Sequence, residues 1–177
     1  MSLRKLLLIL LPALVCSQLF AQDSDALYRK LPQEGFVLYF LSPTSFKAKP
    51  GKVRLETDFT FQYRDQRPDS VDMKFSLFSK KPVRGLDSLV IFSGTQRLGA
   101  TNTLEIMFLQ KDKGKWHSRF STPIPYSTLE QMLSAGPGLA IKIYAAGLTL
   151  NFPAGKDWRE AAEVLKEILA VEIGTGG

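Results

Sequence analysis

Hydrophobic and polar residues alternate along residues 53–64, whose sequence is Val-Arg-Leu-Glu-Thr-Asp-Phe-Thr-Phe-Gln-Tyr-Arg. The odd positions are mostly apolar or aromatic, and every even position is polar or charged. Because successive side chains of a β-strand point to opposite faces, this pattern predicts one long strand with a buried face and a solvated face. A sheet with one solvated face is typical of antiparallel architectures.

Residues 71–78 alternate in the same way. The intervening residues 65–70 have the composition of a turn, so the two segments are predicted to form a β-hairpin. Their apolar faces coincide only if odd-numbered residues pair with odd-numbered residues, for example with Phe61 near Met73. A shift of one residue would bury the charged side chains instead.

Six further short segments are apolar or alternating and are bounded by glycine, proline or polar residues. They cover residues 36–41, 88–93, 103–110, 116–122, 139–145 and 148–152. Residues 42–52 are predicted to form a loop and residues 94–102 a polar connection, and Pro123 and Pro125 are predicted to end the strand before them. About eight strands of this kind predict a mainly β fold, either an antiparallel β-sandwich or a partly closed barrel.

Two helices are predicted in the C-terminal third of the chain. Ser127 and Glu130 have the spacing of a capping box, which predicts a short helix from Ser127 to about Ala135. Asp157 is the predicted N-cap of a second helix, in which apolar residues recur at helical spacing. These residues are Trp158, Ala161, Ala162, Leu165, Ile168 and Leu169. We expect the helices to cover one end or one open edge of the sheets.

The first 21 residues have the pattern of a secretory signal peptide that is cleaved after Ala21. Arg4 and Lys5 form its basic start, and its apolar run is shorter than the about 20 residues needed to span a bilayer. A lipid anchor on Cys16 is an alternative, but the preceding Val15 is larger than the small residue expected there. The protein is therefore predicted to be exported, either to the periplasm or as a secreted protein.

Cleavage would leave a flexible lead-in at residues 22–35, a single β-rich domain with its C-terminal helix at residues 36–173, and a frayed tail at residues 174–177. The mature chain would keep 156 of the 177 residues and no cysteine, and its net charge would fall from +6 to +4 because Arg4 and Lys5 are removed. We therefore expect no disulfide, no thiolate metal site and no transmembrane span in it. So small a charge is not typical of a nucleic-acid-binding protein.

Nine basic residues lie in three of the predicted connections. They are Lys47, Lys49, Lys52, Lys80, Lys81, Arg84, Lys111, Lys113 and Lys115. If each strand runs opposite to the one before it, the three connections meet at one end of the fold. The positive field there would attract an anionic glycan, a lipid headgroup or an acidic protein surface. Lysine-rich hairpin tips also serve solubility and the protection of sheet edges, which is the alternative explanation.

Catalytic motifs and phosphate-binding or calcium-binding loops are not found in the sequence. His117, the only histidine, is predicted to lie on the solvated face of its strand, opposite Trp116 and Phe120. Glu56 and Asp58 share one strand face at roughly 7 Å between Cα atoms. Paired carboxylates serve glycoside hydrolases, but cross-strand ion pairs explain these two equally well.

The sequence therefore predicts a non-catalytic, exported binding module that contacts an anionic partner through its lysine-rich end. We expect no catalytic residue, no metal ion, no cofactor and no nucleic-acid partner. Two alternatives stay open. One is a glycan-acting hydrolase of the cell envelope that uses the paired carboxylates, and the other is a carrier that holds a small apolar ligand inside its β-structure.

Overall fold

The computed structural model describes residues 27–49 and 52–174, which form two antiparallel β-sheets and two α-helices. Sheet A has six strands in the order β1-β2-β3-β4-β8-β7, and sheet B has four in the order β10-β9-β5-β6. The elements are β1 (Tyr28–Gln33), β2 (Phe36–Lys47), β3 (Arg54–Tyr63), β4 (Ser70–Ser79), β5 (Ser88–Ser93), β6 (Gln96–Thr101), β7 (Glu105–Asp112), β8 (Lys115–Pro125), α2 (Tyr126–Ser134), η1 (Gly136–Gly138), β9 (Leu139–Ala145), β10 (Leu148–Pro153) and α3 (Lys156–Glu172). The predicted signal peptide, with Cys16, lies outside the described residues.

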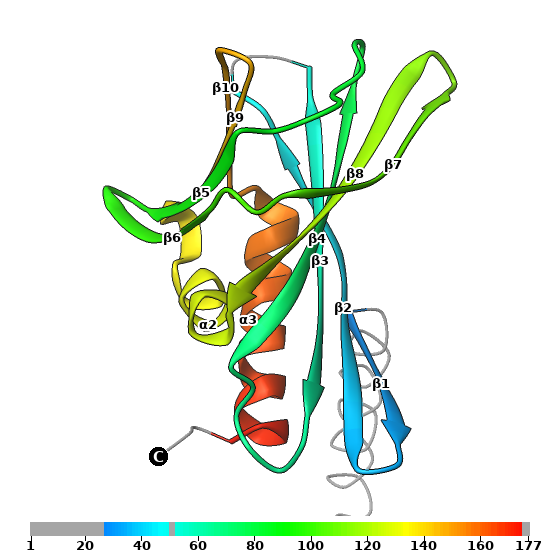
Figure 1. The fold of residues 1–177 in the computed structure, drawn as a ribbon. Coiled ribbons are helices and arrows are strands. Elements are labelled where there is room, and N and C mark those ends of the chain that lie inside the picture. Colours follow the sequence, from blue (N-terminus) through cyan, green and yellow to red (C-terminus); the bar gives the residue numbers. More distant parts are fainter. Residues whose placement is uncertain (1–26, 50–51, 175–177) are drawn as a thin grey trace, which may run out of the picture.

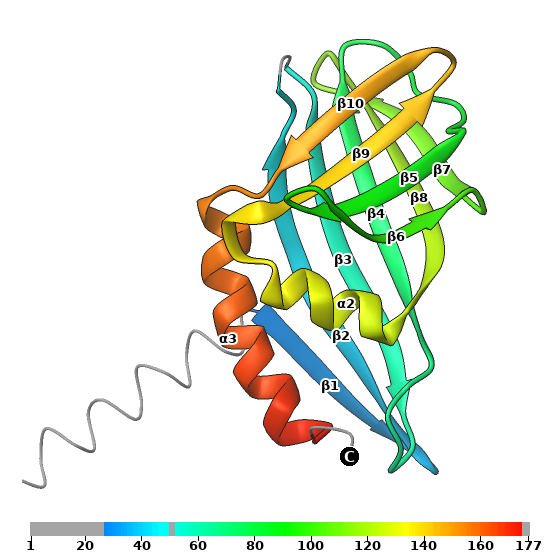
Figure 2. The same cartoon turned by 90° about the vertical axis from the view of Figure 1, so that its left-hand side faces the viewer.

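Sheet B and the two helices cover the same face of sheet A (Figure 1). Figure 2 shows β5, β6, β9 and β10 in front of one half of sheet A and α2 and α3 in front of the other half. Helix α3 contacts β2, and helix α2 contacts β4, β6 and β8. The prediction of an antiparallel β-sandwich with two helices in the C-terminal third is confirmed. Sheets A and B are separate ladders among the described residues and do not close into a barrel.

The alternation along β3 and β4 places their odd-numbered residues in the core. Leu55, Thr57, Phe59 and Phe61 are all at most 3% exposed, and the even-numbered residues of β3 are half-buried or exposed. The two strands pair odd residues with odd residues, as predicted, and Phe59 is the partner of Met73. The example of Phe61 near Met73 was therefore two residues out of register, although the buried face was correct.

Strand β2 continues past the predicted end at Leu41, so the prediction of a loop at 42–52 is wrong for residues 42–47. The register between β2 and β3 shifts between Leu41 and Thr44. Such a bulge accommodates Pro43, which cannot donate a ladder hydrogen bond. Beyond the bulge, Phe46 is fully buried. The second half of β2 therefore also contributes to the core.

Strand β8 likewise continues through Pro123 and Pro125, which were predicted to end it. Strand β7 pairs with β8 only as far as Ser121. Beyond that residue one side of β8 faces no paired strand, so a backbone without an N–H group is tolerated there. The chain then passes from Pro125 directly into α2.

Two exposed strands were not predicted. β1 lies within residues 22–35, for which a flexible lead-in was predicted, and it pairs with β2 from Tyr28 to Gln33. β6 lies within the predicted polar connection 94–102 and forms a hairpin with β5. Both are edge strands of their sheets, and neither contains a buried residue, since five of six residues are exposed in β1 and three of six in β6. The alternation that marks a half-buried strand is therefore missing from their sequences.

The predicted side-chain caps of both helices are wrong. Helix α2 begins at Tyr126, whose backbone N–H donates to the carbonyl of Asp69 at 3.0 Å. Ser127 is thus already inside the helix, and Glu130 forms an ion pair with Arg67 instead of closing a capping box. Helix α3 begins after Gly155, without a side-chain cap. Asp157 lies in its first turn, where a carboxylate still interacts favourably with the helix dipole.

Helix α3 packs on sheet A through the stripe that its sequence predicts. Trp158 is 1% exposed, and Ala161, Ala162, Leu165 and Leu169 are buried with it. The Trp158 ring lies 5.4 Å from the ring of Phe46 and 6.2 Å from that of Phe59, measured between centroids. One continuous core therefore joins the helix to β2 and β3.

Candidate functional site

The three lysine-bearing connections lie at one end of sheet A (Figure 1). Lys47 of β2 pairs there with Arg54 of β3, and Gln110 of β7 pairs with His117 of β8. Phe78 of β4 links the two pairs, because it is the partner of both Arg54 and His117. One row of residues thus crosses five strands, and the β2–β3, β4–β5 and β7–β8 connections all lie just beyond it. We call the nine basic residues in these connections and at the strand ends next to them the basic pole.

All nine side chains of the basic pole are exposed to solvent. None of them forms an ion pair with a residue that the structure describes. Two carboxylates, those of Asp87 and Asp112, belong to the same connections. The Asp87 carboxylate accepts a hydrogen bond from the backbone N–H of Ala146 at 2.9 Å. The positive charge of the pole therefore exceeds the negative charge beside it and faces the solvent.

A tight turn places Lys113 at the tip of the β7–β8 hairpin. Asp112 pairs with Lys115, so Lys113 and Gly114 alone form the loop. Their φ angles are 45° and 78°, and positive φ at both loop residues is the requirement of a type I′ turn. This turn matches the twist of antiparallel strands. It therefore closes the hairpin tightly, with Lys111 and Lys115 on the two strands beside it.

An open cavity of about 310 Å³ lies within the basic pole, between the two sheets. Its lining consists of Lys52, Val53, Ser79, Lys80, Lys81, Val83, Leu148 and Leu150. Sheet A and its connections supply the first six of these residues, and β10 of sheet B supplies the two leucines. The cavity therefore joins an apolar wall to three of the basic residues.

Two polar groups at the β4–β5 connection form hydrogen bonds within the protein. The Ser79 hydroxyl donates to the carbonyl of Lys81 at 2.5 Å. The backbone N–H of Val83 donates to the hydroxyl of Ser118 at 3.3 Å. These groups are thus engaged with the protein itself, and the wall that they support is mainly hydrocarbon.

The apolar residues of this cavity were not identified from the sequence. Val83 lies in a predicted loop and Leu150 in a predicted strand, and they meet only because β10 lies over the end of sheet A. A hydrogen bond from the Lys49 backbone N–H to the Asn151 carbonyl (2.9 Å) joins the two sheets at this end. Leu148 gives the one local signal in the sequence, because this leucine directly follows the tight turn before β10. In the structure its side chain is 54% exposed.

His117 lies on the face of sheet A that sheet B and the helices leave open, as the sequence predicts. Its ring stacks on Phe78 with 4.3 Å between centroids and meets the edge of Phe108 at 4.8 Å. Burial lowers the pKa of His117, and the charge of Arg119 lowers that pKa further. Its Nε2 atom is buried and has no hydrogen-bond partner among the described residues. The ring therefore packs as an aromatic group against Phe78 and Phe108.

The two carboxylates that suggested a hydrolase are each held by an arginine. Glu56 Oε1 accepts a hydrogen bond from Arg54 Nη1 at 2.5 Å. Both oxygens of Asp58 accept from Arg119 Nη2, at 3.0 and 2.8 Å. Arg119 also donates to the hydroxyl of Ser76 at 3.0 Å. The Asp58–Arg119 pair is a cross-strand ion pair between β3 and β8, of the kind that the sequence offered as the alternative to a catalytic pair, whereas Arg54 and Glu56 pair within β3.

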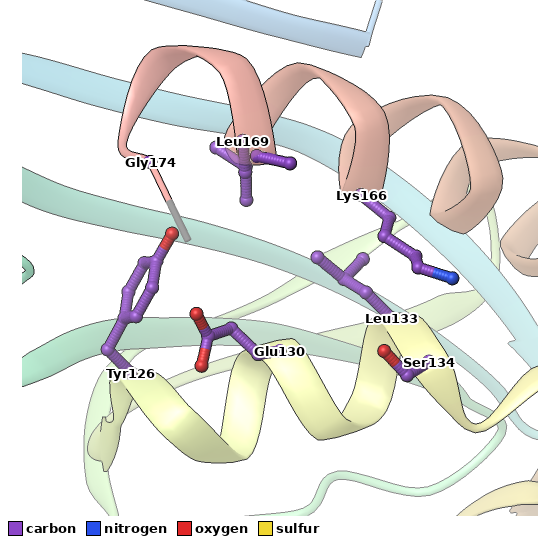
Figure 3. A pocket seen from close by; sticks show the side chains of 8 residues that line it. Tyr126, Glu130, Leu133, Ser134, Lys166, Leu169 and Gly174 are labelled. Carbon is purple, nitrogen blue, oxygen red and sulfur yellow. The ribbon is translucent and has the colours of Figure 1, made fainter. Parts of the chain in front are cut away.

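A second cavity, of about 200 Å³, lies between α2 and α3 (Figure 3). Figure 3 shows Tyr126 and Glu130 reaching into it from α2, with Lys166 and Leu169 on α3 opposite them. Burial, followed by the charge of Glu130, raises the pKa of Tyr126 to about 12. The lining thus holds one carboxylate and one ammonium group, so it does not favour a ligand of either charge.

The fold and the site together define the class of this protein as a two-layer antiparallel β-sandwich with a basic pole. Comparison with known protein families, with curated proteins and with solved structures finds no match for the chain. Within residues 27–49 and 52–174, no three His, Cys, Asp or Glu side chains are grouped so that they could hold a metal ion. No helix in that part of the chain has the length and apolar character needed to cross a membrane.

Proposed function

We propose that the protein is a non-catalytic, exported binding module, of the cell envelope or secreted, whose basic pole contacts an anionic partner. The partner is an anionic glycan, a lipid headgroup or an acidic protein surface. One observation carries the proposal: nine exposed basic residues, from three connections distant in sequence, gather at one end of sheet A. The signal-peptide pattern of residues 1–21 supports the proposed export.

The chemistry of the pole favours recognition of charge density over recognition of one fixed shape. Eight of its nine basic residues are lysines, and an ammonium group on a flexible stem binds phosphate, sulfate or carboxylate without a preferred geometry. Exposed charges of this kind are screened over about 10 Å at 0.1 M salt. Binding should therefore weaken steeply as the salt concentration rises.

Retention on immobilised heparin, a sulfated glycan, tests the proposal. The wild-type protein should be retained at low salt and eluted by a salt gradient. Replacing Lys49, Lys81 and Lys113 by glutamate changes one residue in each connection. It should abolish retention because the net charge of the pole, with Asp87 and Asp112 included, falls from +7 to +1. Circular dichroism verifies that the variant keeps its fold.

A matched control replaces Arg29, Arg97 and Lys166 by glutamate. These three residues are exposed and lie outside the basic pole, so the net charge changes equally while the pole stays intact. The control should elute close to the wild-type salt concentration. If both triple variants lose retention equally, net charge alone accounts for binding and the proposal is rejected.

A further inference from the structure

The cavity within the basic pole combines two properties that a purely charged surface does not need. Eight residues that the structure describes line the cavity, and four of them are apolar, namely Val53, Val83, Leu148 and Leu150. Three others are lysines, and no carboxylate is among the eight. The cavity is thus apolar along its wall and positively charged at Lys52, Lys80 and Lys81.

From this arrangement, and resting on the proposed function, we infer that the cavity binds an anionic amphiphile with a single acyl chain. The hydrocarbon chain lies against the two leucines of β10, against Val53 of the β2–β3 connection and against Val83 of the β4–β5 connection. The head, a carboxylate or phosphate, lies among the ammonium groups of Lys52, Lys80 and Lys81. Apolar burial holds the chain, and charge attraction fixes which end faces outward.

The dimensions of the cavity restrict the ligand. A volume of about 310 Å³ is near the lower limit of small-molecule sites, which range over about 300–1,000 Å³. One acyl chain suits a space of this size better than a lipid with two chains. The opening of the cavity to solvent leaves the head hydrated, so its charge need not be buried.

The polar groups of the cavity argue against a sugar as its occupant. A sugar needs several hydrogen-bond donors and acceptors in its site. Ser79, the one hydroxyl residue of the lining, already donates to the Lys81 carbonyl. A cationic amphiphile would meet three lysines and no carboxylate, so it would be repelled. The cavity between α2 and α3 lacks this bias because Glu130 and Lys166 both line it.

Isothermal titration with dodecanoate, kept below the concentration at which it forms micelles, tests the inference. The wild-type protein should bind one dodecanoate per chain, and dodecyltrimethylammonium should show no saturable binding. Replacing both Lys80 and Lys81 by glutamine should weaken dodecanoate binding roughly tenfold, because charged hydrogen-bond partners of the head are lost. Replacing both Lys111 and Lys113 by glutamine is the control, since neither residue lines the cavity, and it should leave dodecanoate affinity unchanged.

Two further variants address the apolar wall. Val83→Trp fills the cavity and should abolish dodecanoate binding while retention on heparin persists. Leu148→Asp changes a half-exposed residue, so it tests the wall even if Val83→Trp fails to fold, and it should also abolish binding. Absence of saturable dodecanoate binding to the wild-type protein, or equal binding by Leu148→Asp, overturns the inference.

An assay with phosphatidylglycerol vesicles distinguishes binding of the protein to a bilayer from binding of one acyl chain in the cavity. Sedimentation with these vesicles, or retention on heparin, without any dodecanoate binding would overturn the cavity inference and leave the proposed function standing. If the wild-type protein is not retained on heparin but binds dodecanoate saturably, the proposed function is overturned and the cavity inference stands. The two proposals therefore fail separately.

Discussion

At position 117 the chain places a titratable ring where a positive charge is unfavourable. The His117 ring stacks on Phe78 and meets the edge of Phe108, and Arg119 lies on the same strand face. Burial lowers its pKa first, and Arg119 lowers it second. Because the folded-state pKa is below the unfolded value of about 6.5, the unfolded chain binds the proton at the higher pH. Stability is therefore lost as the pH falls through about 6.5 towards the folded-state pKa.

The single histidine makes this prediction directly measurable by proton NMR. The one set of imidazole resonances should titrate with a pKa below 6.5 in the folded protein. The variant His117→Phe keeps an aromatic ring between its neighbours and should show less loss of thermal stability between pH 7 and pH 5 than the wild type. An imidazole that titrates at or above its ordinary value would contradict the packing described for this residue.

At the scale of residues, the sequence predicted which face of a strand each side chain lies on, and it did not predict the contacts between strands. Alternation placed His117 on the open face and Leu55 and Phe59 in the core, because a strand has only two faces. It could not supply Arg119 as the partner of Asp58, since that contact depends on β8 lying beside β4 with β3 beyond it. A pair distant in sequence follows from strand order, which the hydrophobic pattern does not encode.

The end of α3 is attached to sheet A by one carboxylate. Glu172 accepts hydrogen bonds from Lys30 Nζ at 2.5 Å and from the Tyr39 hydroxyl at 2.9 Å. A carboxylate at a helix C-terminus faces the negative end of the dipole, so these two donors offset an unfavourable position. They lower the pKa of Glu172, the bond from Lys30 having the largest effect. Strands β1 and β2 are thereby joined to the last turn of the helix.

Replacing Glu172 by glutamine should destabilise the protein by about 1 kcal/mol near neutral pH, the size of a typical hydrogen-bond contribution. The folded-state pKa is below the unfolded value, so the contribution is complete above about pH 4.3 and is lost as the pH falls further. The difference in melting temperature between the wild type and the variant should therefore become smaller as the pH is lowered from 7 to 3. Glu167→Gln, at an exposed position of the same helix, should show no such difference.

At the scale of elements, the sequence predicted the strands that have a buried face, and it missed two of the four edge strands, β1 and β6. In β1 only Tyr28 is half-buried and the remaining five residues are exposed, so no apolar face marked it. The helix positions were predictable from their apolar stripes, but their caps were not. The start of α2 is determined by β8 running directly into it and by the bond from Tyr126 to Asp69, which is a tertiary contact.

For the whole molecule, the gathering of charge at one end follows from topology. The sequence assigned the three lysine-bearing connections to one end by assuming that every strand reverses direction, and a count that includes the unpredicted β6 would send the third connection to the other end. The assignment holds because β2, β4 and β7 run in the same direction within sheet A, so all three end at the pole. The second layer could not be predicted in the same way, because the sequence does not say which half of sheet A is covered by sheet B and which by helices. The cavity between the sheets depends on that arrangement, and so do its apolar residues.

Helix α3 is held on sheet A by a large buried side chain. Trp158 of α3 is buried against Phe46 of β2 and Phe59 of β3. Its replacement by alanine should destabilise the protein by about 3–5 kcal/mol, because a large buried side chain leaves a cavity. Domains of this size have about 5–15 kcal/mol of stability in total. The loss should therefore appear as a large fall in the urea concentration at the midpoint of unfolding, measured by circular dichroism.

Because the core is continuous, unfolding of the Trp158→Ala variant should remain a single transition. Trp116 gives a matched control, since it is half-buried in β8 near the basic pole, and Trp116→Ala should lower the midpoint much less. The fluorescence of Trp116, the one tryptophan left in the Trp158→Ala variant, reports on sheet A, while circular dichroism also reports on the helices. If the two signals change at different urea concentrations, α3 unfolds separately and the core is not one cooperative unit.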